Sequence, residues 1–258
     1  RALLEQATRR YIAAQSAGEP RYLQRLAPDL DAVVYIENGN SSTPLRGGIL
    51  SQPLKIDHTR AQHDPVSCAA YVELIVTDSR HPYELGTQLW LDAATGRISK
   101  VDTLVTDALD WLFSARHSLH YALLEDWGPI LPEGKRDTRA VIKAAADAYL
   151  DLFNDTSVKV PWGEGCRRLE GGLYTQPGNT CASGVPQGIP LVNRRYVIDE
   201  EYGTVDVFLN FGQNGLQDSH EFRVEEGKIR FIHTITVCPT PNCGFGEPPD
   251  ILKQDPGW

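Results

Sequence analysis

The chain has 258 residues, of which 41% are hydrophobic, and a formal net charge of −9 at pH 7. This composition supplies a hydrophobic core for one large domain or two ordinary ones, and it excludes a disordered chain. Lys and Arg are scattered, whereas nucleic acids and anionic membranes bind clustered positive charge, so neither is an expected partner. No apolar run approaches the ~20 residues that cross a bilayer. A small molecule is therefore the expected ligand.

The first half predicts a helix followed by several strands. Residues 3–14 carry apolar residues at helical spacing. A polar connection, residues 37–39 (Glu-Asn-Gly) and a Gly/Pro/Ser-rich stretch precede an apolar strand over residues 70–77. A closing hairpin over residues 87–91 and 96–103 completes this half.

The segment from 107 to 136 reads as a connection between two domains. It contains a predicted helix over 108–124 and then an extended crossing with Trp127, Pro129 and Pro132. We expect a first domain over residues 1–130, which includes this helical linker, and a second over residues 131–258.

The second half repeats the order of the first. A helix is predicted over 139–153, then comes Glu-Gly-Gly at 170–172, a strand over 204–211, and a hairpin over 220–224 and 227–234. Such self-similarity indicates a diverged repeat. The predicted fold class is α+β, with two tandem cones that each pack helices on a curved, mostly antiparallel sheet.

Five cysteines favour an oxidising compartment, namely Cys68, Cys166, Cys181, Cys238 and Cys243. Their spacing does not fit a zinc site, so no metal is expected. Two disulfides are predicted among the last four cysteines, and three connectivities remain open. Cys68 begins an apolar run and is expected to be a buried free thiol.

Two further features point to the secretory pathway. The chain contains no methionine, even at position 1, which is typical of a processed chain whose signal peptide has been removed. Asn40 and Asn154 each begin an N-x-[ST] sequon. We therefore expect a secreted glycoprotein with both asparagines as acceptors.

The hairpin of the second half suggests a catalytic pair. If residues 226–227 form its two-residue turn, Phe222 faces Phe231 and His220 faces His233 on one apolar face. Two imidazoles roughly 5 Å apart cannot both be charged cheaply, so at least one pKa is expected to be depressed. That property suits acid–base catalysis near neutral pH. The alternative is a pair of core histidines that bond to the backbone or to each other.

Four other residues are candidates for the site. The same register in the first half puts Asp102 in the place of His233, opposite Thr87. Arg195 and Asp199 lie four apart on one strand face, where they form either a structural ion pair or part of a site. Trp162 follows the second helix, at the expected rim of the cone, and serves either packing or ligand binding.

Each half resembles the SnoaL-like, nuclear-transport-factor-2-like cone, and the tandem is similar to a secreted fungal family of two such cones. The resemblance rests on the stretches Tyr35-Ile-Glu-Asn-Gly39, Cys166-Arg-Arg-Leu-Glu-Gly-Gly172, Arg194-Arg-Tyr-Val-Ile-Asp-Glu-Glu-Tyr-Gly203 and Phe222-Arg-Val-Glu-Glu-Gly-Lys-Ile-Arg230. It covers nearly the whole chain. Cones of this kind include isomerases, dehydratases, cyclases and binding proteins, so the likeness speaks for fold more than for function.

The resemblance extends to glycosylated hetero-Diels–Alder enzymes that join a tropolone to a terpene. It implies loss of water to give an ortho-quinone methide and [4+2] addition to an alkene. His220, His233 and Asp199 would then be catalytic, and Phe222, Phe231, Arg195, Trp162 and Asp102 would bind substrate. No nucleophile elbow, P-loop, dinucleotide or HExxH motif is present, so no cofactor is expected.

Three functions remain open at this stage. The first is the cyclising enzyme of fungal secondary metabolism, or a dehydratase or isomerase of another small molecule. The second is a secreted binding protein or effector without catalysis. The third is a hydrolase or lyase that acts on plant-wall aromatics or sugars, although paired carboxylates are not apparent. Assembly as a homodimer is also left open.

Overall fold

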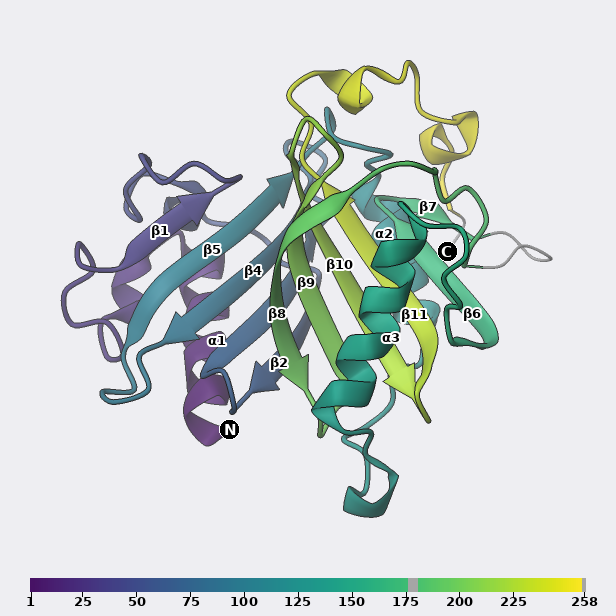
Figure 1. Cartoon of the computed structure of the whole chain (residues 1–258). Coiled ribbons are helices and arrows are strands. Elements are labelled where there is room, and N and C mark those ends of the chain that lie inside the picture. Colours follow the sequence, from purple (N-terminus) through teal and green to yellow (C-terminus); the bar gives the residue numbers. More distant parts are fainter. Residues whose placement is uncertain (176–180, 257–258) are drawn as a thin grey trace. The chain divides into compact units, whose positions relative to one another are not determined.

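The computed structural model describes residues 1–175 and 181–256. The chain divides into two compact units, Arg1–Asp107 and Ala108–Trp258 (Figure 1). The predicted boundary lay near residue 130, with the helical linker in the first domain. In the structure the linker helix α2 (Ala115–Leu124) belongs to the second unit.

The first unit packs one long helix on a five-stranded sheet. In chain order its elements are α1 (Ala2–Ala17), β1 (Val34–Glu37), β2 (His58–Asp64), β3 (Ala69–Val76), β4 (Tyr83–Leu91) and β5 (Ile98–Thr106), with short 3-10 turns at Pro20–Leu23 and Ile49–Ser51. The strand order is β1-β5-β4-β3-β2, in which β1 runs parallel to β5 and the other neighbours are antiparallel.

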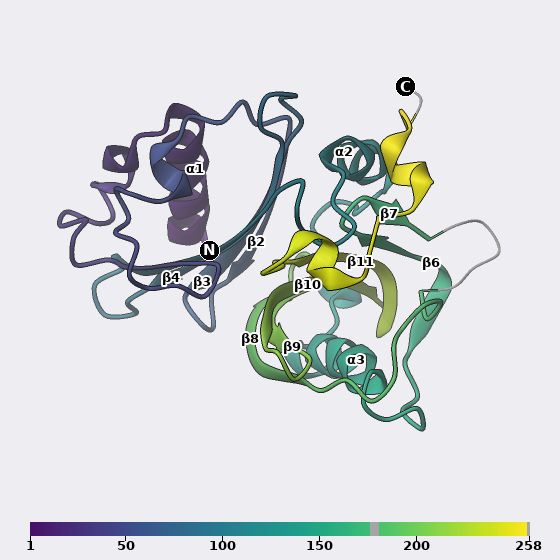
Figure 2. The same cartoon turned by 90° about the horizontal axis from the view of Figure 1, so that it is seen from above.

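Helix α1 buries one apolar face against this sheet. Leu4, Ala7, Tyr11 and Ala14 follow one another at helical spacing and are all buried. The helix ends at Gly18, whose φ of 66° is the left-handed conformation that favours glycine. Figure 2 shows α1 against the concave side of the sheet.

The second unit repeats this arrangement with one added strand. Its elements after α2 are α3 (Arg139–Leu152), β6 (Trp162–Glu170), β7 (Leu173–Tyr174), β8 (Leu191–Asp199), β9 (Thr204–Phe211), β10 (Leu216–Glu225) and β11 (Lys228–Thr236), with 3-10 turns at Glu133–Lys135, Pro241–Gly244 and Asp250–Lys253. The order is β7-β6-β11-β10-β9-β8, and β6 runs parallel to β11. The predicted α+β class, with two mostly antiparallel sheets in tandem, is confirmed.

Helix α3 occupies the curve of the second sheet (Figure 2). Thr138 caps its start by accepting a hydrogen bond from the Val141 amide. Ile142, Ala146 and Tyr149 are buried on the face that meets the sheet. A helix with an apolar stripe and a strand face with alternating apolar residues thus form the core of the unit.

The hairpin of the second unit turns where the sequence predicts. Glu226 and Gly227 have φ angles of 51° and 69°, which are typical of a type I′ turn. Val224 then pairs with Ile229, also as expected.

The register expected beyond that pair was wrong. Arg230 is an extra residue in β11, a β-bulge, so every later residue of β11 is displaced by one position. His220 pairs with Thr234, while His233 pairs with Glu221. Since side chains alternate along a strand, the two histidines lie on opposite faces of the sheet. The basis for expecting a depressed pKa in a histidine pair is therefore removed.

Two adjacent apolar residues explain why the sequence predicts the wrong register for this hairpin. Phe231 and Ile232 are neighbours, so alternation alone does not decide which of them faces the core. The bulge puts Ile232 inside, opposite Phe222, and Phe231 on the other face.

The first unit has the same bulge at Ser99. Thr87 therefore pairs with Thr103 and not with Asp102, which pairs with Gln88 on the outer face. The expected register was wrong here for the same reason.

The structure contains the two predicted disulfides, Cys166–Cys181 and Cys238–Cys243. Cys68 is a free thiol, half-buried where full burial was expected. Asn40 and Asn154 are both exposed.

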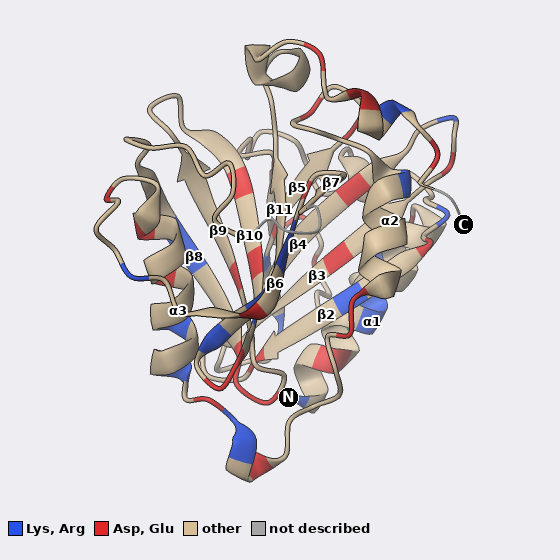
Figure 3. Ribbon diagram, turned by 90° about the vertical axis from the view of Figure 1, so that its right-hand side faces the viewer, with Lys and Arg blue, Asp and Glu red and all other residues tan. Residues whose placement is uncertain are grey.

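Charged residues are spread over helices, strands and loops of both units (Figure 3). Among the described residues, no helix combines the length and apolar character needed to cross a membrane.

Candidate active site

A cavity of about 290 Å³ opens inside the second unit. Its walls come from α3, from the inner faces of β10 and β11, and from the loops that follow β7 and β11. Phe153, Ile189 and Phe211 belong to a mainly apolar lining. The volume is at the lower end of the ~300–1,000 Å³ range of ligand pockets, and an apolar cavity with a few polar groups is typical of them.

Asp218 and His220 form the polar floor of this cavity. They are two residues apart on β10, so both side chains point inward. His220 Nδ1 lies 2.6 Å from Asp218 Oδ1, although the two atoms lack the alignment of a hydrogen bond. Thr236 donates to the other carboxylate oxygen at 2.7 Å. Both residues are at most 3% exposed.

The imidazole of His220 is enclosed by aromatic rings. Its centroid lies 5.6 Å from that of Tyr149 and 6.1 Å from those of Phe153 and Phe222. Its Nδ1 faces Asp218, so Nε2 is the ring nitrogen left to contact a molecule in the cavity.

Tyr149, whose ring lies beside this histidine, adds a phenol to the cavity lining. Its hydroxyl oxygen accepts from Arg168 Nη1 at 3.3 Å, which leaves the hydroxyl hydrogen to point elsewhere. Burial raises the pKa of Tyr149 to about 12, with the charge of Arg168 acting in the opposite direction. The phenol therefore stays protonated at neutral pH.

Arg168 and Glu170 form another part of the cavity wall. Both lie on β6, and Arg168 Nη2 lies 3.1 Å from Glu170 Oε2. The other oxygen of Glu170 accepts from the indole of Trp111 at 2.7 Å. Burial disfavours the charged form of Arg168, but Tyr149 and Glu170 outweigh it, so its pKa is raised.

One disulfide contributes to the cavity lining, and the other lies next to a loop that does. The Cys166–Cys181 bridge fixes the start of the loop whose Gly184, Val185 and Pro186 line one side. Cys243 lines the cavity near its edge. There Phe245, 73% exposed, packs edge-on against the ring of Trp111.

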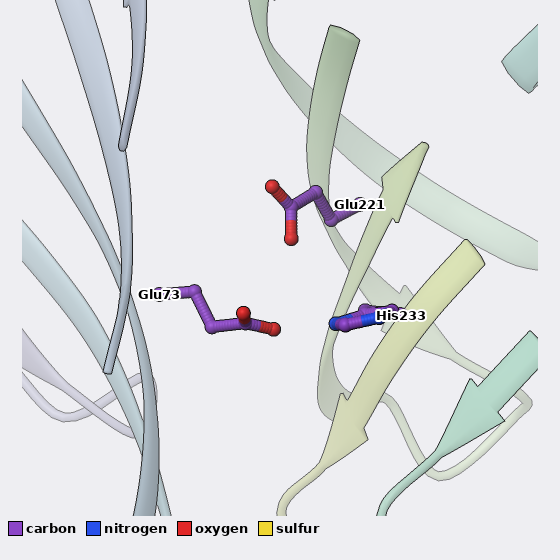
Figure 4. Close-up of side chains that lie close together, drawn as sticks. All are labelled: Glu73, Glu221 and His233. Carbon is purple, nitrogen blue, oxygen red and sulfur yellow. The ribbon is translucent and has the colours of Figure 1, made fainter. Parts of the chain in front are cut away.

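The four residues of the predicted hairpin site are not all brought together. His220 lines the cavity, and Phe222 packs behind it. His233 lies on the outer face, where its Nε2 is 2.7 Å from Glu125 Oε2. Phe231 shares that face and stacks on Trp127 at 5.7 Å. Figure 4 shows the side chains of Glu221 and His233, which come from paired positions on β10 and β11.

The remaining candidates in the second unit also lie away from the cavity lining. Asp199 is fully buried and accepts from the Tyr202 amide at 3.1 Å. Arg195 on β8 lies over the ring of Phe208, its pairing partner on β9. Trp162 packs edge-on against Tyr149, 5.8 Å between centroids. These contacts fit structural roles for all three.

The first unit has a different set of residues at the equivalent positions. The Tyr11 hydroxyl lies 2.7 Å from Thr87 Oγ1, which in turn lies 2.7 Å from Thr103 Oγ1. This chain of hydroxyls replaces Tyr149, His220 and Thr234 of the second unit. Asp102 points to the outer face, where Lys100 is 3.5 Å away. The first unit thus lacks an imidazole at this place.

Sequence reasoning missed three residues of the site. Asp218 could have been predicted from the sequence, because it precedes His220 by two residues and so lies on the same face of the strand. Tyr149 has a counterpart in Tyr11 at the same place in the repeat. Arg168 gives no such signal, because its position depends on the parallel pairing of β6 with β11.

One of the comparisons with known proteins matches a segment of the same unit. Residues 135–236 match the family model described as "Domain of unknown function (DUF8021)". The matched segment contains the Asp218–His220 pair, Tyr149 and Arg168. Among solved structures, the chain is similar to an NTF2-like protein of unknown function from Cytophaga hutchinsonii. The two are 12% identical, with 38% of this chain and 83% of that chain covered and a TM-score of 0.28. A search of the curated proteins returned no match.

Proposed function

We propose that the second unit is a cofactor-free acid–base enzyme that removes water from a small aromatic alcohol. The observation that carries this proposal is the Asp218–His220 pair on the floor of an apolar cavity, with the ring of Tyr149 beside it. A cavity that only stored an apolar molecule would have no need of a buried carboxylate and imidazole, which are costly to desolvate.

The reaction that suits these groups begins with an ortho-hydroxybenzyl alcohol. His220 Nε2 takes the phenolic proton, and the carbon–oxygen bond to the benzylic hydroxyl breaks. The same proton is returned to the departing hydroxide, so the products are water and a neutral ortho-quinone methide. No oxidant or reductant is needed, and general acid–base catalysis of this kind contributes typically ~10²–10⁴-fold.

Tyr149 has a distinct task in this scheme. Its pKa of about 12 means that it donates a hydrogen bond without giving up its proton. A donor held near the phenolic oxygen stabilises the negative charge that develops there as the proton leaves. Arg168 fixes the orientation of the Tyr149 hydroxyl through its 3.3 Å contact.

The [4+2] addition of the quinone methide to an alkene is the second step of the proposal. It requires proximity rather than proton transfer. Support for it is narrower, namely the resemblance described above and the exposed ring of Phe245 at the cavity edge, which offers an apolar surface to a second reactant. We also propose an extracellular location, which the two disulfides support.

Oxygen exchange tests the first step directly. A secondary ortho-hydroxybenzyl alcohol is incubated with the protein in oxygen-18 water, and incorporation of the label at the benzylic carbon is followed by mass spectrometry. Wild-type protein should accelerate exchange, and His220→Gln should lose at least about 100-fold of that acceleration. His233→Gln is the matched control and should retain most of it, because His233 does not line the cavity.

Two outcomes would contradict the proposal. Equal loss in both variants would assign the effect to folding, and wild-type protein that binds the alcohol without exchange would favour a binding protein. Trapping with ethyl vinyl ether separates the second step. A chroman product of one handedness indicates addition inside the cavity, whereas a racemic product limits the enzyme to dehydration.

A further inference from the structure

We infer that the cavity selects neutral, hydroxyl-bearing ligands and rejects carboxylates and phosphates of the same shape. This inference deepens the proposed function and rests on it, because it concerns the same cavity. Its grounds are the charges that line the cavity and the way in which each one is already satisfied.

The floor of the cavity presents a buried polar pair. Asp218 Oδ1 and His220 Nδ1 lie 2.6 Å apart, and neither atom makes an aligned hydrogen bond among the described residues. A carboxylate oxygen only accepts hydrogen bonds, so a ligand that approaches it must bring a donor. A hydroxyl group supplies that donor and also accepts from the Tyr149 hydroxyl. A ligand carboxylate supplies no donor at neutral pH.

Arg168 is the one buried cation among the described cavity residues, and protein acceptors already engage its guanidinium group. Arg168 Nη1 contacts the Tyr149 hydroxyl and donates to the Cys181 carbonyl at 2.7 Å. Its Nη2 donates to the Ser183 carbonyl at 2.7 Å and lies 3.1 Å from Glu170. Both terminal nitrogens therefore have two protein acceptors each. A ligand anion would have to displace one of these contacts.

The described lining offers no positive charge to a ligand anion. Glu170 offsets Arg168, and Asp218 places a carboxyl group beside His220. An anion brought into an apolar cavity loses its hydration and gains no free cation in return. The free-energy cost of desolvation is far smaller for a neutral hydroxyl, because its hydrogen bonds with Asp218 and Tyr149 replace those with water.

Three para-substituted phenols test this inference on the whole chain. They are para-hydroxybenzyl alcohol, para-hydroxybenzamide and para-hydroxybenzoate, with dissociation constants measured by calorimetry at neutral pH. The alcohol and the amide should bind, and the benzoate should bind at least about tenfold more weakly. The amide matters because it has the shape of the benzoate without its charge.

Asp218→Asn provides the variant arm. It keeps the size of the side chain and removes the charge, so the disadvantage of the benzoate relative to the amide should shrink to about threefold or less. If this variant fails to fold, the three wild-type constants still decide the matter.

The outcomes are separable. Benzoate binding as tight as that of the amide would overturn the inference and leave the oxygen-exchange proposal standing. Binding of none of the probes, together with no exchange, would overturn both.

Discussion

The Nδ1 atom of His220 lies 2.6 Å from Oδ1 of Asp218, two residues earlier on the same strand of the second sheet. The carboxylate is held in place by Thr236, which donates to its other oxygen. A small rotation of the ring would align a hydrogen bond between the pair. The carboxylate would then fix the tautomer that presents Nε2 to the cavity as a base.

Asp218→Asn should therefore lower oxygen exchange more than it lowers stability. We expect a loss of about 10- to 100-fold in exchange, because an amide can present either its oxygen or its NH2 group to Nδ1 and so no longer fixes the tautomer of the ring. Steady-state exchange rates and thermal unfolding of the same sample check this. A fall in unfolding temperature with normal exchange per folded molecule would contradict a role in catalysis.

The raised pKa of Tyr149 predicts how the free energy of unfolding changes with pH in the alkaline range. Its pKa in the folded chain is about 12, above the ordinary value of 10.0. Between these values the unfolded chain loses the phenolic proton while the folded chain keeps it, so the free energy of unfolding falls as pH rises. The full difference corresponds to about 2–3 kcal/mol.

Tyr149→Phe should remove that part of the alkaline loss, since phenylalanine does not titrate. Urea unfolding at several pH values from neutral to strongly alkaline measures it. Tyr11→Phe is the matched variant, because burial also raises the pKa of Tyr11 to about 12. An unchanged slope in both variants would show that these tyrosines do not titrate as described.

The two disulfides should differ in their effect on stability. The Cys166–Cys181 bridge spans 15 residues and Cys238–Cys243 spans 5. Loop-closure entropy gives about 3 kcal/mol for the longer loop and about 2 kcal/mol for the shorter. Paired Cys→Ser variants, compared by urea unfolding, test this order, and a larger loss from the shorter loop would contradict it.

Loss of the Cys166–Cys181 bridge should also weaken ligand binding. The loop that begins at Cys181 forms one wall of the cavity through Val185 and Pro186. Calorimetry with para-hydroxybenzyl alcohol on the folded double Cys→Ser variant should show a several-fold weaker dissociation constant. Unchanged affinity would mean that the Arg168 contacts alone hold this wall.

The sequon asparagines provide a test of the secretory route. Asn40 and Asn154 are both exposed, so an oligosaccharide fits at either. Protein expressed through a eukaryotic secretory pathway should lose mass on treatment with an N-glycosidase. Asn40→Gln and Asn154→Gln should each remove one glycan, and an unmodified wild-type chain would contradict the prediction.

The sequence predicted the repeat and most helices and strands, because each helix has its own apolar stripe and each strand its own alternation. The strand over 204–211 has the predicted bounds. Strands β2 and β8 were not delimited, since their polar residues, such as Arg60 and Arg195, conceal the alternation.

The candidate site was predicted less well than the fold. The turn at Glu226 and Gly227 was right, yet one bulge at Arg230 sent His233 to the other face. A bulge inserts a single residue, and apolar residues on either side satisfy both registers. In the first unit the spacing of three between Ile98 and Val101 was a readable sign of the bulge.

The most direct test of the central claim is a crystal structure of the chain soaked with para-hydroxybenzamide. We expect density for the ligand inside the second unit, with its hydroxyl within hydrogen-bond distance of the His220–Asp218 pair and of the Tyr149 hydroxyl. Ligand density elsewhere in the molecule, with this cavity filled only by water, would contradict it.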